Sequence, residues 1–496
     1  MAGDTPSGAT PTARESSGEM AAKPAMTRRA TARQHPFALV APMLASALVL
    51  GIVGGFALAT LLTVTRALNV ALGAWWTAAA QAHGHLQLYG WVGLFVLGVA
   101  CYFVPRLRGA PLAGAGFVPW VLAALVSSLV LRGIAQPLVA ATGAGVWRVA
   151  FALSAPLEAA ALLGAVGMLA ATLRAGPPLR SRPALWSILP FVAGAFVALG
   201  LAGLVNAANV FAAAATPTGI VPPAGDDLNV TLGLFGFLIP LALAMSARFL
   251  PMYAGLDAFP RGMLAPLAGA YLAGLALFAA GTAGGLAPGA WSGIVTGTGM
   301  LLVGGALVAF IAVFLKMMPR RGRLPERVTR LAPSAEAAAR VYRDRVSSDR
   351  GAYGPFVALI ASAYTWAAVG GVLLVVDGLA SLFGGTPPIA LDIARHSLAV
   401  GFIALLLCGV SQRMIPGFSG GTIRSPALVL ATLWLGNGAA VLRVGAPLLL
   451  PLAARAGGVA LAVDGIAFGL AGPVGLALAC CLAINLWPAV WAKARG

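Results

Sequence analysis

Charged side chains are scarce in this chain, and their scarcity excludes an ordinary soluble globular protein. Only 9% of the 496 residues are charged, while 60% are hydrophobic. Soluble domains carry roughly 25% charged residues. A transmembrane helix needs about 20 consecutive apolar residues, and such runs follow one another almost from end to end. The composition predicts an all-α, polytopic membrane bundle embedded in a lipid bilayer.

Cysteine and histidine are also rare, with four of each. The cysteines are Cys101, Cys408, Cys480 and Cys481, and all of them lie in apolar runs. Because none forms a CxxC pair, no zinc or iron–sulfur framework is visible, and we interpret them as small buried apolar residues.

Basic residues outnumber acidic ones by 32 to 14, but their distribution argues against a nucleic-acid partner. Most fall in the termini and in alternate connections between the predicted helices, which is the positive-inside pattern. We therefore predict a bacterial inner-membrane protein with cytoplasmic N- and C-termini. Six basic residues fall on the predicted external side: Arg66, Arg132, Arg148, Arg395, Arg443 and Arg455.

The apolar runs predict a membrane domain over residues 35–496, after a disordered basic cytoplasmic tail over 1–34. A basic cytoplasmic loop over 317–353 interrupts it and is expected to hold a short amphipathic helix around Glu336–Val346. Twelve helices are predicted, at roughly 37–64, 84–104, 116–138, 149–173, 185–207, 229–250, 263–283, 291–316, 355–380, 391–414, 426–447 and 462–490.

The chain also contains an internal repeat, which becomes visible when His85, Thr231 and His396 are aligned without gaps. Five residues after these starting points each stretch has glycine, followed by an aromatic residue; proline comes at twenty residues and glycine again at twenty-four. The three stretches are the second, sixth and tenth helices. We therefore predict three pseudo-repeats of four helices, over about 37–173, 185–316 and 355–490.

The histidines carry the sharpest functional hypothesis. His85 and His396 occupy the same repeat position, and the predicted topology places both near the external face. Ionisable residues inside a membrane are rare and usually functional. Two imidazoles at equal depth on two helices suit the axial ligands of a b-type haem. The alternative is that each histidine merely bonds a neighbouring helix or lies in the headgroup region.

His83 and Arg395 are two further candidates for the same site. On a helix His83 lies about 200° from His85, so it is predicted to bind a second metal such as copper, or a haem propionate, unless it is simply an interfacial histidine. Arg395 adjoins His396 and either pairs with a propionate or marks the membrane edge. His35 lies in the tail and is expected to have no special role.

Few acidic residues lie in or near the predicted apolar layer. Glu158 falls within the fourth helix, and no chain of acids follows it, so proton pumping is not expected. Asp226 and Asp227 precede the sixth helix and are expected to be solvated. The other acids near the apolar layer are Asp377, Asp392 and Asp464.

Three local motifs resemble the NnrS-like family of membrane proteins: HGHLQLYGW from His83, RHSLAVG from Arg395, and SARFLPMYAG from Ser246. That family is associated with haem and copper and with tolerance of nitric oxide. The resemblance implies that His83, His85 and His396 are metal-centre residues. It departs at Leu86, where the family commonly has an acid.

The layout also resembles subunit I of the haem-copper oxidases, which has twelve helices in three arcs and low-spin haem ligands on helices two and ten. That resemblance implies copper ligands on helices six and seven, where this chain has no histidine. We therefore interpret the chain as a membrane protein that binds haem, or haem and copper, with a redox or nitric-oxide-related role in nitrosative stress tolerance. The electron donor and any turnover are left open.

Alternative functions are a secondary transporter, an oxidase-like subunit that reacts with nitric oxide or oxygen, and a factor for haem-copper assembly. Repeats and twelve helices suit a transporter, but transporters typically gather polar residues at the midplane. Here the polar residues lie near one face, which favours the haem interpretation.

Overall fold

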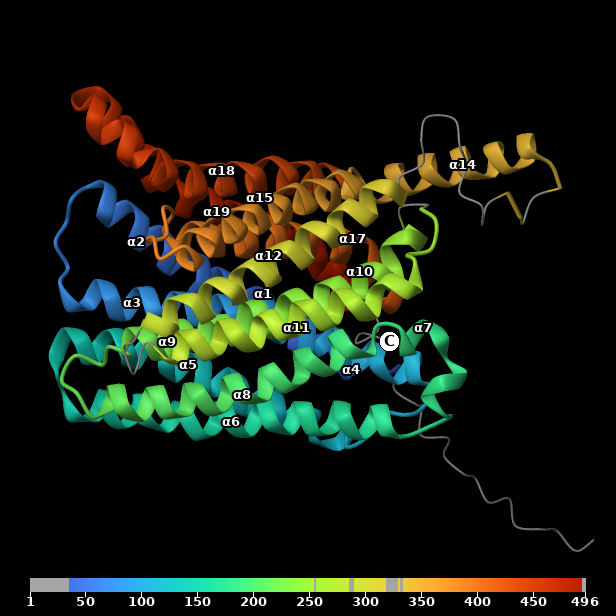
Figure 1. Cartoon of the computed structure of the whole chain (residues 1–496). Helices are drawn as coiled ribbons and strands as arrows, with labels where there is room; N and C mark the ends of the chain where they lie inside the picture. Colours follow the sequence, from blue (N-terminus) through green and yellow to red (C-terminus); the bar gives the residue numbers. More distant parts are fainter. Residues whose placement is uncertain (1–34, 254–255, 285–289, 318–328, 331–332, 493–496) are drawn as a thin grey trace, which may run out of the picture. The chain divides into compact units, whose positions relative to one another are not determined.

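The computed structural model describes residues 35–253, 256–284, 290–317, 329–330 and 333–492. Within these ranges the chain is helical and contains no strand. Twelve helices are long and apolar enough to cross a membrane, and they run side by side as a bundle (Figure 1). The prediction of an all-α, twelve-helix membrane fold is confirmed.

The first six spans include three that are interrupted by a π-helical segment, so that one span carries several labels. These spans are α1–η1–α2 (Ala41–Leu50, Gly51–Phe56, Ala57–Ala67), α3–η2–α4 (Ala74–His85, Leu86–Gly93, Leu94–Arg108), α5 (Val118–Thr142), α6 (Gly145–Arg174), α8 (Leu189–Ala214) and α9–η5–α10 (Pro223–Val230, Thr231–Leu238, Ile239–Tyr253).

The last six spans include one with such an interruption, the tenth. They are α11 (Arg261–Gly284), α12 (Ala290–Met317), α15 (Phe356–Leu382), α16–η6–α17 (Leu391–His396, Ser397–Ala404, Leu405–Ser419), α18 (Pro426–Ala456) and α19 (Gly458–Val490).

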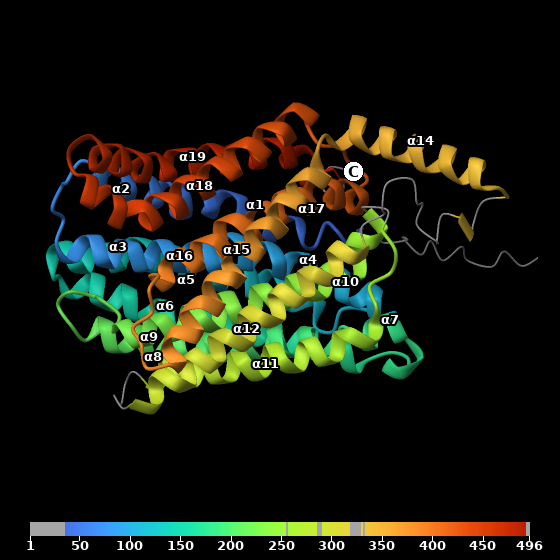
Figure 2. The same cartoon turned by 45° about the horizontal axis from the view of Figure 1, so that its top comes forward.

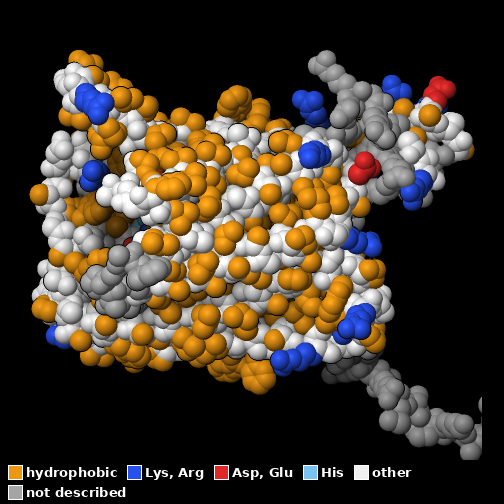
Figure 3. All heavy atoms as spheres, viewed as in Figure 1, with side chains coloured by type: hydrophobic (Ala, Val, Ile, Leu, Met, Phe, Trp, Pro, Cys, Tyr) orange, Lys and Arg blue, Asp and Glu red, His pale blue; other side chains and the backbone are white. Residues whose placement is uncertain are grey.

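Three spans form the interior of the bundle, and they are the three repeat helices. Buried residues make up 78%, 83% and 72% of the most apolar stretches of the second, sixth and tenth spans, against at most 56% in the other nine. The sides of the bundle, by contrast, expose hydrophobic side chains, while Lys and Arg gather mostly towards its ends (Figure 3). We call the second, sixth and tenth spans the inner helices.

Each inner helix changes to π-helix at the same place in the repeat. Counted from His85, Thr231 and His396, the π-helical segments η2, η5 and η6 begin within one residue of the starting point and end seven or eight residues later. π-Helical turns are rare and are frequently found at functional sites. The sequence gives no cue for them, yet their coincidence supports the ungapped alignment of the three repeats.

The repeated glycines have identifiable structural reasons. A Cβ atom on Gly236 would meet the Ala198 side chain, and one on Gly401 would meet Trp366, as expected for close helix packing. The glycine twenty-four residues into the repeat ends its helix: Gly109 has φ +69° and Gly420 has φ +71°, a left-handed conformation that favours glycine.

The basic loop contains the amphipathic helix that the sequence predicts, and this helix is longer than predicted. This helix, α14 (Ala335–Tyr353), begins at Ser334, whose hydroxyl accepts a hydrogen bond from the Ala337 backbone N–H. It extends beyond the ends of the neighbouring helices (Figure 2). Asp349 of α14 pairs with Arg413 of α17 at 3.3 Å, so the loop is attached to an inner helix.

Orientation in the membrane remains a prediction, and it can be tested with reporter fusions. A reporter that is active only in the cytoplasm should be active when fused after Arg343 in α14. A reporter that is active only outside the membrane should be active when fused after Thr218, in the connection before α9. The reason is the uneven division of basic residues. Reporters on the same side for both positions would contradict the alternating twelve-helix topology.

Candidate functional site

The three membrane histidines line one cavity of about 540 Å³. Its wall comes from the π-helical region of the three inner helices and from parts of α2, α18 and α19. Small-molecule and cofactor sites typically measure roughly 300–1,000 Å³. We call it the histidine cavity. It brings together His83, His85, His396 and Arg395, all of the residues predicted for the site.

His396 is oriented by residues at the start of its own span. Its Nδ1 lies 2.8 Å from the backbone oxygen of Asp392 and 3.0 Å from the carboxylate of the same residue. The other carboxylate oxygen of Asp392 accepts a hydrogen bond from Arg443 of α18 at 2.5 Å. One acid therefore orients the imidazole and also ties α16 to α18.

His83 is held in a similar way by a different element. Its Nδ1 lies 2.8 Å from the backbone oxygen of Gly55 in η1. The charged groups that act electrostatically on His83 are His396, Arg443 and Asp392. His83 therefore lies on the same side of the histidine cavity as His396.

His85 lies in a different electrostatic environment. Its Nε2 is 2.8 Å from the Glu158 carboxylate of α6, and both side chains are almost completely buried, at 2% and 0% exposed. Its ring also contacts Tyr89, with ring centroids 4.6 Å apart. The charged groups that act on it are Arg132 and Glu158. Glu158 thus has a partner that no spacing in the sequence indicates.

Arg132 belongs to a buried polar network inside the bundle. It lies within α5 and is only 2% exposed. Its guanidinium donates to Asn206 of α8 and, at 3.2 Å, to Gln136. Gln136 in turn donates to Gln81 at 3.0 Å. The interior of the bundle near the histidines therefore holds a connected chain of polar groups. In the sequence Glu158 looks isolated, so this network is not predicted.

Arg395 forms an ion pair within the protein. It pairs with Asp227 of α9 at 2.6 Å, which links the tenth span to the sixth. Asp226 and Asp227 do not precede the sixth span, as the sequence predicts, but belong to α9 and line the histidine cavity. The expected solvation holds for Asp227, whose side chain is 47% exposed. Arg395 keeps two buried nitrogens, Nε and Nη2, without a hydrogen-bond partner.

His85 also lies deeper than predicted, whereas His396 lies where the sequence predicts it. The second span begins at Ala74, ten residues before the predicted start at 84, because Trp75, Trp76 and Gln81 interrupt the apolar run without ending the helix. His85 is therefore eleven residues, roughly 16 Å, along its span at 1.5 Å per residue. His396 lies five residues into its own span.

The donor atoms of the cavity fit a flat, anionic cofactor bound between two imidazoles. In the described part of the chain, no residue hydrogen-bonds to Nε2 of His83 or of His396. Aromatic rings complete the wall: Trp91 meets Phe56 edge-on at 4.8 Å between ring centroids, and both line the cavity. Two imidazole nitrogens, apolar walls and unsatisfied guanidinium N–H groups are together the chemistry that haem requires.

The described residues contain no group of three or more His, Cys, Asp or Glu side chains gathered closely enough to hold a metal ion. Copper(I) also binds methionine sulfur, so this arrangement does not test the copper role of His83, which stays a prediction.

Comparison with known proteins identifies the fold. No family model matches the sequence, and no curated protein does. Among solved structures, a haem-copper terminal oxidase, determined as a dimer by cryo-EM, matches with a TM-score of 0.62 and 12% identity. The match covers 93% of this chain and 84% of that one. The chain shares the fold of a haem-copper terminal oxidase. At this identity the likeness concerns the fold, and function does not follow from fold.

Proposed function

We propose that the protein holds a b-type haem in the histidine cavity, with His83 and His396 as its axial ligands. The observation that carries this proposal is the shared hydrogen bonding of the two rings. Each Nδ1 is bonded to a backbone oxygen, of Gly55 and Asp392, and each Nε2 is left without a partner. Metal-ligating histidines almost always use one ring nitrogen in this way, which orients the other towards the metal.

The pairing differs from the one that the repeat predicts. The repeat pairs His85 with His396 because they share a position, but Nε2 of His85 is bonded to a buried carboxylate. Ligation through Nε2 would break the hydrogen bond to the buried Glu158, which costs free energy, and the same ring also has Asn229 as a hydrogen-bond partner. We therefore assign His85 to the polar network of Glu158 and Arg132, and His83 to the haem.

Two arginines suit the propionates of such a haem. Arg395 and Arg443 both line the histidine cavity, and each has at least one buried nitrogen without a partner. Their other nitrogens are held by Asp227 and Asp392. Guanidinium–carboxylate pairs are among the strongest hydrogen-bonded ion pairs in proteins. The two arginines would bind the anionic edge of the haem while remaining anchored to the protein.

A haem with two histidine ligands supplies one-electron transfer. The role that we propose is therefore a redox one. Its link to nitric oxide and nitrosative stress rests on the local motifs around His83, Arg395 and Ser246 and on no contact in the structure. The copper role of His83 stays a prediction of the sequence.

The decisive experiment is a visible absorption spectrum of the purified full-length protein, oxidised and dithionite-reduced. A low-spin b-type spectrum, with one haem per chain by the pyridine haemochrome assay, is the expected result. Protein that is folded and stable in detergent but takes up no haem on reconstitution would overturn the proposal and favour a transporter.

The role of Asp392 gives a more specific prediction. Replacing it with alanine removes the carboxylate that holds His396 and Arg443, and loss of such an orienting partner typically lowers metal-site affinity by about 10–100-fold. Haem dissociation, measured by transfer to apomyoglobin, should accelerate by a similar factor. Asp464→Ala, which changes an acid of α19 outside the cavity, is the control. Equal dissociation rates in both variants would contradict the orienting role.

A further inference from the structure

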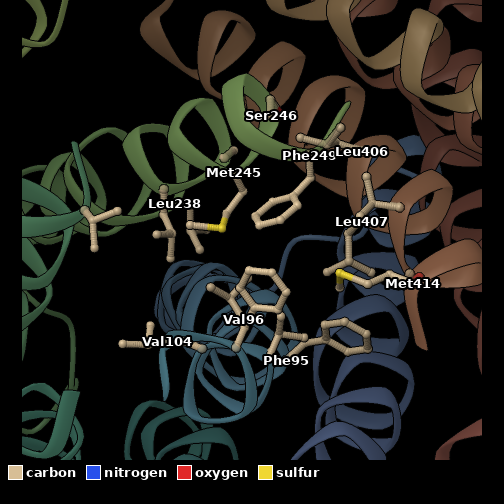
Figure 4. A pocket seen from close by; sticks show the side chains of 18 of the residues that line it. Phe95, Val96, Val104, Leu238, Met245, Ser246, Phe249, Leu406, Leu407 and Met414 are labelled. Atoms are coloured by element: carbon tan, nitrogen blue, oxygen red, sulfur yellow. The ribbon is translucent and has the colours of Figure 1, made fainter. Parts of the chain in front are cut away.

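A second cavity lies between the three inner helices, next to the histidine cavity, and Leu173 of α6, Leu185 and two residues of α8 complete its wall. Its volume is about 150 Å³, and it is surrounded almost entirely by apolar side chains (Figure 4). Among its lining residues only Ser246 and Ser411 carry polar side-chain atoms. None of the lining residues is exposed at the surface of the molecule. We call this second cavity the apolar chamber.

The apolar chamber lies where the three repeats meet. Counted from His85, Thr231 and His396, the residues at +7, +10, +11, +14, +15 and +18 all line it, and each of these positions contributes one residue from every inner helix. A spacing of three, four, seven and eight is one face of an α-helix. The three inner helices therefore present the same face to one common space.

The residues at +7 belong to both cavities. Val92, Leu238 and Ile403 line the histidine cavity and also the apolar chamber. They are 5%, 3% and 5% exposed. The residues at +3 from each inner helix line only the histidine cavity. We call Val92, Leu238 and Ile403 the +7 ring; it is the apolar partition between a polar, charged cavity and a dry one.

The volume and the apolar lining of the chamber suit a small apolar ligand. A cavity of this volume lined by Leu, Ile and Phe stays dry and binds small apolar molecules such as benzene or xenon. A haem or a charged substrate would leave polar groups unsatisfied there. The Ser411 hydroxyl is 1% exposed and has no hydrogen-bond partner among the described residues. A small molecule with one weak acceptor atom would satisfy it.

We propose that the apolar chamber is a binding site for a small, uncharged and apolar molecule of a size from xenon to benzene, which enters from the histidine cavity across the +7 ring. The chamber is built from the protein alone, so the proposal does not rest on haem. It gives the interior of the inner-helix bundle a role beyond packing: it concentrates an apolar ligand beside the histidine cavity.

Xenon is the probe that tests the site itself. Crystals or nanodisc samples of the full chain under xenon should show one bound atom between the inner helices, by anomalous scattering or by xenon NMR. Ala100→Leu, which fills the chamber at +15, should reduce the bound fraction at least tenfold. Leu407→Ala, which enlarges it at +11, should increase the bound fraction. Ala123→Leu, an exposed alanine of α5, is the matched control and should change nothing.

The opposite signs of the two chamber variants separate a site from general destabilisation. Both variants disturb packing, but only a real site loses xenon in one and gains it in the other. Wild-type protein that binds no xenon, or in which acyl-chain density fills the chamber, overturns the proposal. Absence of haem would overturn the proposed function and leave the xenon result unaffected, so the two failures are distinguishable.

The route of entry is tested at the +7 ring. Val92→Phe enlarges one side chain of the ring, so we expect slower xenon exchange by at least tenfold with an unchanged equilibrium occupancy. Phe103→Trp, at the far end of the chamber, is the control. If the control slows exchange and Val92→Phe does not, xenon enters from the opposite end and the proposed route is wrong.

Discussion

Replacing His83 or His396 with alanine is expected to abolish the low-spin haem spectrum. Each supplies one axial bond in our assignment, and neither bond has a substitute among the residues that line the cavity at that side. In contrast, His85→Ala should retain low-spin haem, since Nε2 of His85 is bonded to Glu158. The measurement is the reduced-minus-oxidised spectrum together with electron paramagnetic resonance, which separates low-spin from high-spin iron.

The three histidine variants also act as controls for one another. All are His→Ala changes within the same cavity. His85→Ala is expected to be the most destabilising of the three because it leaves Glu158 buried without its hydrogen-bond partner, so loss of haem only in the other two variants would not reflect poorer folding. Added imidazole should restore a low-spin spectrum in His83→Ala and in His396→Ala by filling the vacated ligand position. If His85→Ala loses low-spin haem while His83→Ala keeps it, the repeat-based pairing is correct and the one argued from hydrogen bonds is wrong.

Glu158→Ala should be among the most destabilising single substitutions in the chain. The change leaves Arg132 and His85 buried without the carboxylate that acts on both. Removing one partner of a buried charged pair typically costs about 3–5 kcal/mol. The free energy of unfolding, followed by circular dichroism during titration with sodium dodecyl sulfate, should fall by this amount.

Two variants distinguish the loss of charge from the loss of volume. Glu158→Gln keeps the size of the side chain and an acceptor for His85 but removes the charge. The decrease in the free energy of unfolding in Glu158→Gln therefore measures the loss of the charge, and the further decrease in Glu158→Ala measures the loss of volume and of the acceptor. The double variant Glu158→Leu with Arg132→Leu removes both charges. Its loss of stability should be smaller than the sum of the losses in the single variants Glu158→Leu and Arg132→Leu. Additive effects in the double variant would show that Glu158 and Arg132 do not interact.

Much of the fold follows from the sequence because its cause is local. Each apolar run is long enough to span a bilayer by itself, so twelve helices can be counted without tertiary information. The repeated glycines and prolines, which identify the inner helices, also act locally, through helix ends and close packing. The start of the second helix was missed because Gln81, which bonds both backbone groups of Val221, looks from the sequence like a loop residue.

The candidate site follows from the sequence only in part. The membrane histidines were identifiable because ionisable residues are so rare in this chain, and the structure brings all three into one cavity. Their roles could not be separated, since the deciding contacts join residues far apart in sequence: His83 with Gly55, and His85 with Glu158. No spacing rule reports such contacts. The buried contacts of Arg132 with Asn206 of another helix are unpredictable for the same reason.

The π-helical segments determine how the inner helices tolerate a change of length. A π-helical turn holds about one residue more than an α-helical turn, so one residue could be deleted between Leu86 and Gly93 and a continuous α-helix would remain. Because the extra residue is absorbed within a single turn, the helix on either side would keep nearly the same face. His83, His85 and the residues lining the apolar chamber would stay directed into their cavities, and only the side chains of the interrupted turn would be displaced. The π-helix thus absorbs a single-residue insertion or deletion between the two cavities without rebuilding the bundle.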